Sequence, residues 1–537
     1  MMPSFLKKIH PHNKTNFYYL CPMKNLPIGI QTITEIRRKN CVYVDKTQLI
    51  HQLAGLGKYY FLSRPRRFGK SLLVSTLKEL FEGNKAVFEG LWIESQWDWS
   101  KTNPVIHISF DSVDYQGLGL NKAIIQALNN CAKKYEIRIE AETLKSTFTE
   151  LIEQLDKKYG KVVILIDEYD KPILDFLETE KLEQAKANRD VLRDFYSVLK
   201  SADAQLELVF ITGISKFSKV SIFSHLNNLT DITLSENYAA LTGYTQEELE
   251  LNFDDYLKLI EQKLKLNREE LLQNMKIWYN GFSWDGVTKV YNPFGTLNFL
   301  SDKVFRNYWF STGSPRFLIE QMRYKEIYNV ENTVVNNVVL DKYDIDNLEL
   351  IPLLFQTGYL TVKEIDIMTG EMVLDYPNKE VRESMYQYLI DDLSKNPSRM
   401  HTGRTIQDLS KAFMNRDLEQ VQNVINSILK DLPHETFDKK SEGLYHGLVH
   451  LIFSYLGVFM LSEVHSYLGR ADVVVETQSD VYIFEFKFNK TAQEAIDQIL
   501  KNDYSGKYKA SGKIITAIGV NFNGEKRGID EWLEVRL

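Results

Sequence analysis

Residues Tyr59–Gly83 read YYFLSRPRRFGKSLLVSTLKELFEG and form the clearest structural pattern in the chain. The aromatic and aliphatic run Tyr59–Leu62 is typical of a buried strand. A turn over Ser63–Ser71 follows and ends in Gly-Lys-Ser. The next segment, Leu72–Phe81, has apolar side chains at helical spacing, and Gly83 suits the end of a helix. A strand, a turn and a helix in this order are the layout of a phosphate-binding loop.

Three residues of this turn have the chemistry that a phosphate-binding loop needs. Backbone N–H groups around Gly69 and at the start of the helix would point at an anion. Lys70 would reach the β- and γ-phosphates of ATP, and the Ser71 hydroxyl would hold Mg²⁺. The sequence therefore predicts a nucleotide site. The alternative is a basic turn that only caps an ordinary helix.

The arginines of the turn depart from the usual motif. Arg64 stands six residues before Lys70, where the motif has glycine. A side chain is thus expected where bare backbone usually turns, which puts the rate of ATP hydrolysis in question. Arg66 and Arg67 add positive charge, and we assign both to the nucleotide site, with contact to a neighbouring subunit as the alternative.

Composition and length place limits on the class of protein. A chain of 537 residues is too long for one core, so three or four domains are expected. Its net charge of −7 gives no bulk attraction to a polyanion, so a nucleic-acid site has to be local. The cysteines Cys21, Cys41 and Cys131 have no metal or disulfide spacing, which favours a reducing cytoplasm.

The sequence predicts no membrane span and an extension at the N-terminus. The most apolar candidate, Leu448–Leu461, contains His450 and Ser454 and is too short to cross a bilayer. Met23 resembles a natural start, so residues 1–22 are expected to be a non-native extension.

A second acidic motif follows the phosphate-loop pattern. Lys161–Asp170 reads KVVILIDEYD, a run too uniformly apolar for a half-exposed strand, which predicts a central strand of a parallel sheet. Ligands bind at the carboxyl ends of such strands. We expect Asp167 to hold Mg²⁺ opposite Ser71, and Glu168 to orient and deprotonate the attacking water. The alternative is an acidic strand end exposed to solvent.

Other segments complete an expected ATPase core and a region that follows it. Thr212 or Ser215 would contact the γ-phosphate, unless the hydroxyl only forms a turn. Residues 26–45 would pack beside the nucleotide base, unless they are a plain edge element. Further strands are predicted at Val42–Val44, Pro104–Phe110, Leu206–Ile214 and Asp231–Leu234, and helices at Asn121–Lys133, Gln246–Leu266 and Glu269–Tyr279.

The middle of the chain contains two less regular patterns. Residues 278–300 are rich in aromatics, glycine and asparagine, which predicts turns around a small aromatic core. Ser314 and Pro315 indicate a helix start, and Arg316 is a candidate second cationic contact. Leu353–Tyr386 predicts helix, strand, turn, strand and helix, an arrangement that resembles a winged helix.

The C-terminal region contains a separate group of polar residues. Val481–Phe488 alternates, so Glu485 and Lys487 share one face while the phenylalanines face a core. Asp472 and Glu485 are hard oxygen ligands for Mg²⁺ or Mn²⁺. Lys487 would orient water and stabilise charge on a phosphate, as metal-dependent phosphodiester cleavage requires. Glu442 would complete the metal site, and Gln498, on a helix capped at Thr491, would position water or phosphate. The alternative is an exposed Glu–Lys ion pair.

These motifs resemble a known family. RPRRFGKS, VVILIDEYDKP, YNGF and LLFQTGYLT are similar to the AAA-ATPase-like proteins of bacteria, and GRADVVVE and YIFEFK are similar to the PD-(D/E)XK nuclease superfamily. The resemblance covers nearly all the chain from Met23. It implies an α/β fold: a P-loop ATPase core with a parallel sheet, a helical lid and winged-helix-like region, and a restriction-endonuclease-like domain. It implies nucleotide roles for Lys70, Ser71, Asp167 and Glu168, and nuclease roles for Asp472, Glu485 and Lys487.

The expected boundaries are 23–235 for the core, 236–320 for the lid, 321–395 for the winged-helix-like region and 405–537 for the nuclease-like domain. Residues 395–404 are expected to be a linker. The leading hypothesis is an ATP-regulated nuclease acting on DNA in genome defence or mobile-element conflict, with homo-oligomers as possible assemblies. Two alternatives stay open: an ATP switch whose nuclease-like domain only binds nucleic acid or protein, and an ATPase without a nucleic-acid partner.

Overall fold

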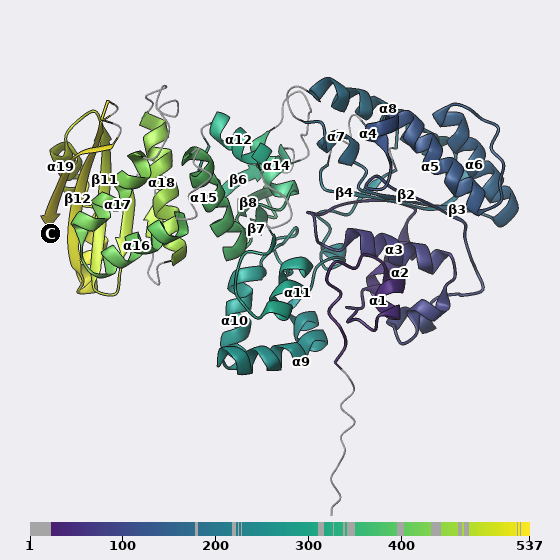
Figure 1. The fold of residues 1–537 in the computed structure, drawn as a ribbon, viewed down its shortest axis with the longest axis horizontal. Coiled ribbons are helices and arrows are strands. Elements are labelled where there is room, and N and C mark those ends of the chain that lie inside the picture. The colour runs from purple at the N-terminus through teal and green to yellow at the C-terminus, as the bar shows by residue number, and fades with distance from the viewer. Residues whose placement is uncertain are drawn as a thin grey trace, which may run out of the picture.

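The structure is a computed structural model, and three parts of the chain follow one another along its longest axis (Figure 1). It describes residues 23–177, 181–216, 222–223, 225–226, 228–309, 316–325, 327–336, 339–340, 349–394, 402–430, 442–459, 464–466, 472–523, 525–526 and 528–537. The expected extension at 1–22, the Ser314–Pro315 helix start and residues 395–401 of the expected linker lie outside the described residues.

The first part is built on a parallel sheet of five strands in the order β2-β3-β4-β1-β5. The strands are β1 (Tyr59–Ser63), β2 (Val105–Ser109), β3 (Val162–Asp167), β4 (Leu206–Gly213) and β5 (Thr230–Asp231). Every residue of β3 is buried, as expected for a central strand covered on both faces. The strands are parallel, and only β4 lies between β1 and β3. The phosphate loop after β1 and Asp167 at the end of β3 therefore lie on the same side of the sheet, at the carboxyl ends of the strands.

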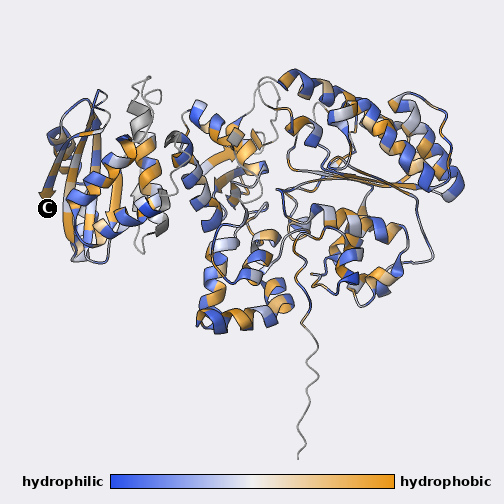
Figure 2. Cartoon of the chain, viewed as in Figure 1, coloured by the Kyte–Doolittle hydropathy of each residue, from blue (hydrophilic) through white to orange (hydrophobic). Residues whose placement is uncertain are grey.

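Helices cover both faces of this sheet (Figure 1). On one face lie α1 (Ile33–Arg38), α2 (Thr47–Leu56) and α3 (Lys70–Phe81); on the other lie α4 (Tyr115–Leu118), α5 (Leu120–Lys134), α6 (Leu144–Tyr159), α7 (Lys171–Leu174) and α8 (Leu182–Ser201). Each face has its own apolar cluster, because alternate strand residues point to opposite sides. Figure 2 shows hydrophobic residues along the strands and hydrophilic residues on the outer helices.

Two predictions for this part were inaccurate. Val42–Val44 is not a strand, because only a single bridge between Asn25 and Cys41 forms beside it. The strand expected at Asp231–Leu234 is shorter and begins one residue earlier, at Thr230, and it pairs with β1 at the sheet edge.

Short 3₁₀ segments lie at Lys85–Phe88, Trp92–Ser95, Asp203–Gln205, Glu236–Tyr238 and, in the C-terminal part, Gly506–Ser511.

The region expected to be a lid, called the lid below, contains α9 (Gln246–Leu264), α10 (Arg268–Tyr279) and α11 (Pro293–Asp302). Reciprocal capping boxes start α9 and α10. The aromatic stretch is turns only in its first half. From Pro293 it is helical, because Asn292 accepts a hydrogen bond from the Gly295 amide and proline suits the first helical turn.

The next part has the expected helix, strand, turn, strand and helix. These elements are α14 (Leu350–Gln356), β7 (Thr361–Ile365), β8 (Glu371–Asp375) and α15 (Lys379–Ser394), preceded by α12 (Arg316–Tyr324). The third strand, β6 (Thr333–Asn336), was missed and pairs with β8. The side chain of Arg316 lies outside the described residues.

The C-terminal part is a mixed sheet in the order β13-β12-β11-β10-β9, which confirms the expected α/β class. Only β11 and β12 run parallel. Phe484 and Phe486 are buried and meet Phe453 from the facing helix, so this face is the core. The elements are α16 (Thr402–Met414), α17 (Leu418–Lys430), α18 (Glu442–Phe459), β9 (Val464–Ser466), β10 (Val473–Glu476), β11 (Asp480–Phe488), α19 (Ala492–Lys501), β12 (Ile514–Asn523) and β13 (Gly528–Arg536).

The middle and C-terminal parts pack against each other through α15 and α18, where Tyr386 and Tyr455 lie with ring centroids 6.2 Å apart. Across the described residues, no helix is both long and apolar enough to pass through a bilayer.

A buried carboxylate joins the lid to α15 and predicts a pH-dependent stability. Glu380 is fully buried and accepts hydrogen bonds from the amides of Tyr308 (2.6 Å) and Trp309 (2.8 Å). Burial raises its pKa from 4.5 to about 7. Its contribution to the free energy of unfolding is therefore fully present below about pH 4.5 and is lost as pH rises through 7. Such a shift corresponds to about 3 kcal/mol.

We expect the melting temperature of the wild type to fall between about pH 5 and pH 8 relative to that of Glu380→Gln. Glutamine keeps an acceptor for the two amides but does not titrate. Differential scanning fluorimetry across this range measures the difference. Parallel curves for the two proteins would contradict the assignment of this titration to Glu380.

Candidate nucleotide and metal sites

The phosphate loop has the backbone geometry of an anion site. Gly69 has φ +87° and precedes α3, so the first amides of that helix open toward the loop. Lys70 is buried, and its Nζ donates to the carbonyls of Arg64 (2.9 Å) and Pro65 (3.0 Å). Burial lowers the pKa of Lys70, while the carboxylates of Asp167 and Glu168 oppose this effect.

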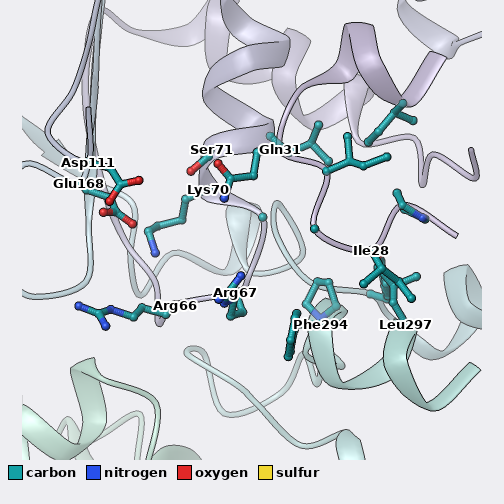
Figure 3. A pocket seen from close by; sticks show the side chains of 18 of the residues that line it. Ile28, Gln31, Arg66, Arg67, Lys70, Ser71, Asp111, Glu168, Phe294 and Leu297 are labelled. Carbon is teal, nitrogen blue, oxygen red and sulfur yellow. The ribbon is translucent and has the colours of Figure 1, made fainter. Parts of the chain in front are cut away.

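A cleft of about 300 Å³ opens above this loop (Figure 3). In Figure 3, Lys70 and Ser71 face Asp111 and Glu168 across one end of the cleft. The other end is mostly apolar and is formed by the N-terminal segment and by α11 of the lid. The lining residues are Pro27, Ile28, Gly29, Ile30, Gln31, Ile36, Arg66, Arg67, Gly69, Lys70, Ser71, Leu72, Asp111, Glu168, Lys171, Tyr244, Pro293, Phe294 and Leu297.

The two carboxylates at the end of β3, Asp167 and Glu168, have different environments. Glu168 lines the cleft and has φ +52°, a strained backbone conformation for a residue with a side chain. Burial raises its pKa, and Lys70 opposes the shift. Asp167 is 3% exposed and is not among the lining residues, but its Oδ1 is buried without a hydrogen-bond partner in the described structure. Such an orphaned acceptor fits a bound cation.

The arginines of the loop lie in three different places. Arg66 and Arg67 both line the cleft and point to different sides (Figure 3). The Arg67 guanidinium lies 4.8 Å from the centre of the Phe294 ring, and Arg67 has φ +69°. Arg64 is fully buried and does not line the cleft, so its side chain does not obstruct the phosphate position.

The hydroxyl groups expected near the γ-phosphate are engaged elsewhere. Thr212 Oγ1 donates to the Leu62 carbonyl (2.9 Å), and Ser215 Oγ donates to Asp170 (2.5 Å). Both residues are buried, and neither lines the cleft. Asp170 also accepts the amides of Ile214 and Ser215, so it joins the ends of β3 and β4.

Sequence reasoning gave no role to two charged residues of the cleft. Asp111 and Lys171 form an ion pair of 3.2 Å. Asp111 follows β2, and the carboxyl ends of parallel strands meet at one edge, so the position of β2 beside β3 explains its placement. This signal was present in the sequence, since the strand expected at Pro104–Phe110 runs directly into Asp111.

The phosphate loop also contacts the part of the chain that leads to the C-terminal sheet. Gly358 has φ +87°, and a Cβ placed on it would lie 2.6 Å from Cγ of Pro65. Nearby, Gln356 accepts a hydrogen bond from the Lys216 amide (3.1 Å), just after β4. The end of α14 therefore contacts the loop and the end of the central sheet.

Replacing Gly358 by alanine is expected to weaken ATP binding roughly tenfold, because the added methyl group strains this turn and displaces Pro65. Isothermal titration calorimetry with ATP and Mg²⁺ measures the change. Gly512→Ala is the matched control, since Gly512 also has a left-handed φ but nothing within 4 Å of a Cβ. If Gly358→Ala and Gly512→Ala bind ATP with equal affinity, the contact between Gly358 and Pro65 does not affect the nucleotide site.

The C-terminal sheet brings four of the predicted polar residues together. β10 and β11 are antiparallel with Val473 opposite Phe484, so Asp472 lies beside Glu485. Asp472 Oδ2 accepts the Phe486 amide (2.8 Å). Lys487 Nζ donates to Glu485 (3.0 Å) and to Gln498 (2.6 Å).

Helix α19 places Gln498 at this position. Thr491 accepts a hydrogen bond from the Glu494 amide at the start of the helix, although the reciprocal bond of a full capping box does not form. The side chain of Glu442, on α18, lies outside the described residues.

The electrostatics of this group differ from those of an exposed ion pair. Glu485 is 2% exposed, and its Oε2 has no hydrogen-bond partner in the described structure. Burial and the neighbouring Asp472 raise the pKa of Glu485 to about 7, while Lys487 lowers it. The pair formed by Glu485 and Lys487 is thus not the exposed ion pair that the sequence left as the alternative. In both sites the residues fit a divalent cation, because Mg²⁺ commonly takes one or two protein carboxylates and completes its coordination with water and phosphate.

Comparisons with known proteins match the two regions of the chain in which these sites lie. A family model described as "Predicted AAA-ATPase" matches residues 27–223, and one described as "PD-(D/E)XK nuclease superfamily" matches residues 440–532. The chain is 36% identical over 524 residues to "Uncharacterized protein in vnfD 5′region" of Azotobacter chroococcum mcd 1, covering 94% of this chain and 98% of the relative. No solved structure matches the chain significantly.

The chain therefore belongs to the AAA-ATPase-like family and has a C-terminal domain of the PD-(D/E)XK nuclease superfamily. This confirms the resemblance seen in the motifs.

Proposed function

We propose that the protein binds and hydrolyses ATP at the phosphate loop and that nucleotide controls a metal-dependent nuclease site that cleaves DNA. The observation that carries this proposal is common to both sites. Each has a buried carboxylate oxygen, on Asp167 and on Glu485, that has no hydrogen-bond partner among the described residues and lies near a lysine of the same site. Unsatisfied buried acceptors are costly, and a bound cation would satisfy them.

At the nucleotide site, Lys70 neutralises the β- and γ-phosphates and the amides after Gly69 bind them. Arg66 and Arg67 supply further positive charge along the cleft. Ser71 and Asp167 would hold Mg²⁺, which would neutralise developing charge on the phosphates. Glu168 accepts the proton of the attacking water, a role that the raised pKa of its carboxyl suits.

At the nuclease site, Asp472 and Glu485 would hold Mg²⁺ or Mn²⁺, with Glu442 as a further candidate ligand. The cation would lower the pKa of a water molecule and polarise the scissile phosphate. Lys487 orients the water and stabilises charge on the phosphate, and Gln498 fixes the Lys487 ammonium through its 2.6 Å hydrogen bond.

The biological setting is part of the proposal. We infer a cytoplasmic protein acting in genome defence or mobile-element conflict, because an ATP-controlled nuclease needs a trigger before it cuts. A homo-oligomer is the proposed assembly, with Arg66 available to an adjacent subunit.

The test is incubation of the protein with plasmid, linear and single-stranded DNA and with RNA, with Mg²⁺ or Mn²⁺, with and without ATP. We expect metal-dependent cleavage of DNA that ATP alters. No cleavage of any substrate with either metal, together with retained DNA binding, would favour a non-catalytic ATP switch instead.

A further inference from the structure

Arg64 is an unusual residue to find wholly buried beside a phosphate loop. Its exposed fraction is 0%, and its guanidinium donates to backbone carbonyls rather than to carboxylates. The Nη1 group donates to Ser63 (2.9 Å) and Thr233 (2.8 Å), and Nη2 donates to Tyr238 (3.4 Å). Burying a charged group is costly unless it is hydrogen-bonded and offset by opposite charge. Burial lowers the pKa of Arg64 to about 9, and the carboxylates of Asp231 and Asp285 oppose this shift.

The contacts of Arg64 join three separate segments. Thr233 and Tyr238 follow β5 at the edge of the sheet. The guanidinium also lies 3.9 Å from the ring centre of Trp284, which belongs to the turn between α10 and α11 of the lid. Arg64 thus ties the start of the phosphate loop to the sheet edge and to the lid.

The main chain of Arg64 contacts the functional lysine. Its carbonyl accepts a hydrogen bond from Lys70 Nζ at 2.9 Å, as does the carbonyl of Pro65. The side-chain contacts of Arg64 therefore fix the carbonyls that hold Lys70.

The backbone at this position does not need glycine. Arg67 and Gly69 have left-handed φ angles in this loop, whereas Arg64 is not among the residues with positive φ. An arginine can occupy the position without strain, and it restricts a loop that glycine would leave free to sample many conformations. Restricting a binding loop in its competent shape improves affinity, because less ordering is needed on binding.

We propose that Arg64 is a positioning residue for nucleotide binding. It takes the place of the usual first glycine and holds the phosphate loop in a fixed position relative to the lid. It does not touch the nucleotide, since it does not line the cleft. This inference rests on the proposed function, namely that ATP binds at this loop.

The first test is Arg64→Gly, which restores the glycine of the common motif. We expect ATP to bind at least about tenfold more weakly to this variant, measured by calorimetry with Mg²⁺ on the full chain. Arg64→Lys keeps the charge but cannot make the same three hydrogen bonds, so it should not restore affinity. Binding to Arg64→Gly as tight as, or tighter than, binding to the wild type would overturn the proposal.

The second test uses the lid. Trp284 does not line the cleft, so its side chain does not touch ATP there; it contacts the phosphate loop through Arg64 and through Phe68, whose ring centre lies 5.4 Å from that of Trp284. We expect Trp284→Leu to weaken ATP binding, and the double variant with Arg64→Lys to be no weaker than the weaker single variant. Trp278→Leu is the matched control, because Trp278 is a lid tryptophan with its own cation contact, to Lys379 at 4.9 Å. It should bind ATP like the wild type.

Melting temperatures without nucleotide separate positioning from a merely structural role. A structural role would lower the melting temperature of the variants but leave the affinity of the folded protein unchanged, and that outcome would overturn the proposal. If Arg64→Gly does not fold, Arg64→Lys and Trp284→Leu decide the question. Failure of the wild type to bind ATP would refute the proposed function, whereas normal binding by the variants would refute this inference alone.

Discussion

Cleavage of DNA should disappear in Asp472→Ala and in Glu485→Ala, and should fall roughly 10²–10³-fold in Lys487→Ala. Either carboxylate variant leaves too few oxygen ligands to hold a hard cation against water. Lys487→Ala should keep metal binding, because only the group that stabilises charge is lost, and deletions of that kind typically have this magnitude. A plasmid-nicking assay with Mg²⁺ or Mn²⁺ measures the activity, and calorimetry measures the metal.

Two controls make this result specific. Glu476 lies on the same strand as Val473 but is paired with Lys513 at 2.7 Å, so Glu476→Ala should cleave normally. Phe486→Ala should instead destabilise the domain by about 3–5 kcal/mol, since Phe486 is 3% exposed and stacks on Phe484 and Phe522. Normal cleavage by both Asp472→Ala and Glu485→Ala would show that this constellation is not the catalytic site.

At the other site, Lys70→Ala should abolish tight ATP binding, because the phosphates lose their neutralising cation in a buried position. Glu168→Gln should bind ATP like the wild type but stop hydrolysis, since glutamine cannot accept the proton of water. Fluorescent-nucleotide titration and phosphate release measure the two effects.

Lys78→Ala is the matched control for Lys70. Lys78 is on the same helix but forms ion pairs with Glu79 and Glu82 and does not line the cleft. It should bind and hydrolyse ATP normally. Wild-type hydrolysis by both Lys70→Ala and Glu168→Gln would place the nucleotide site elsewhere.

Much of the fold was predictable because local patterns agreed with the tertiary structure. The uniformly apolar run before Asp167 gave a strand covered on both faces, and the alternation around Glu485 gave a strand with one aromatic core face. The residues expected around Lys70 come together because β1 and β3, separated by β4, end on the same side of a parallel sheet. Those expected around Lys487 come together because they lie on the paired strands β10 and β11 and on the helix that follows.

Other features could not be read from local sequence. The contacts of Arg64 join it to Thr233 and Trp284, far along the chain, so no local pattern reports them. Val42–Val44 has the composition of a strand but no partner strand to pair with. The helix from Pro293 was hidden by aromatic residues, whose helix propensity is modest, and depends on the Asn292 cap.

The contacts of α14 with the phosphate loop and with Lys216 have a thermodynamic consequence. They give the nucleotide site a physical connection to the part of the chain that packs on α18. Energetic coupling between two binding sites is reciprocal: if ATP changes the affinity for DNA by some factor, DNA changes the affinity for ATP by the same factor. Under the proposed function, DNA bound at the C-terminal site would then change how tightly the phosphate loop holds ATP, so the substrate of one site would be an effector of the other.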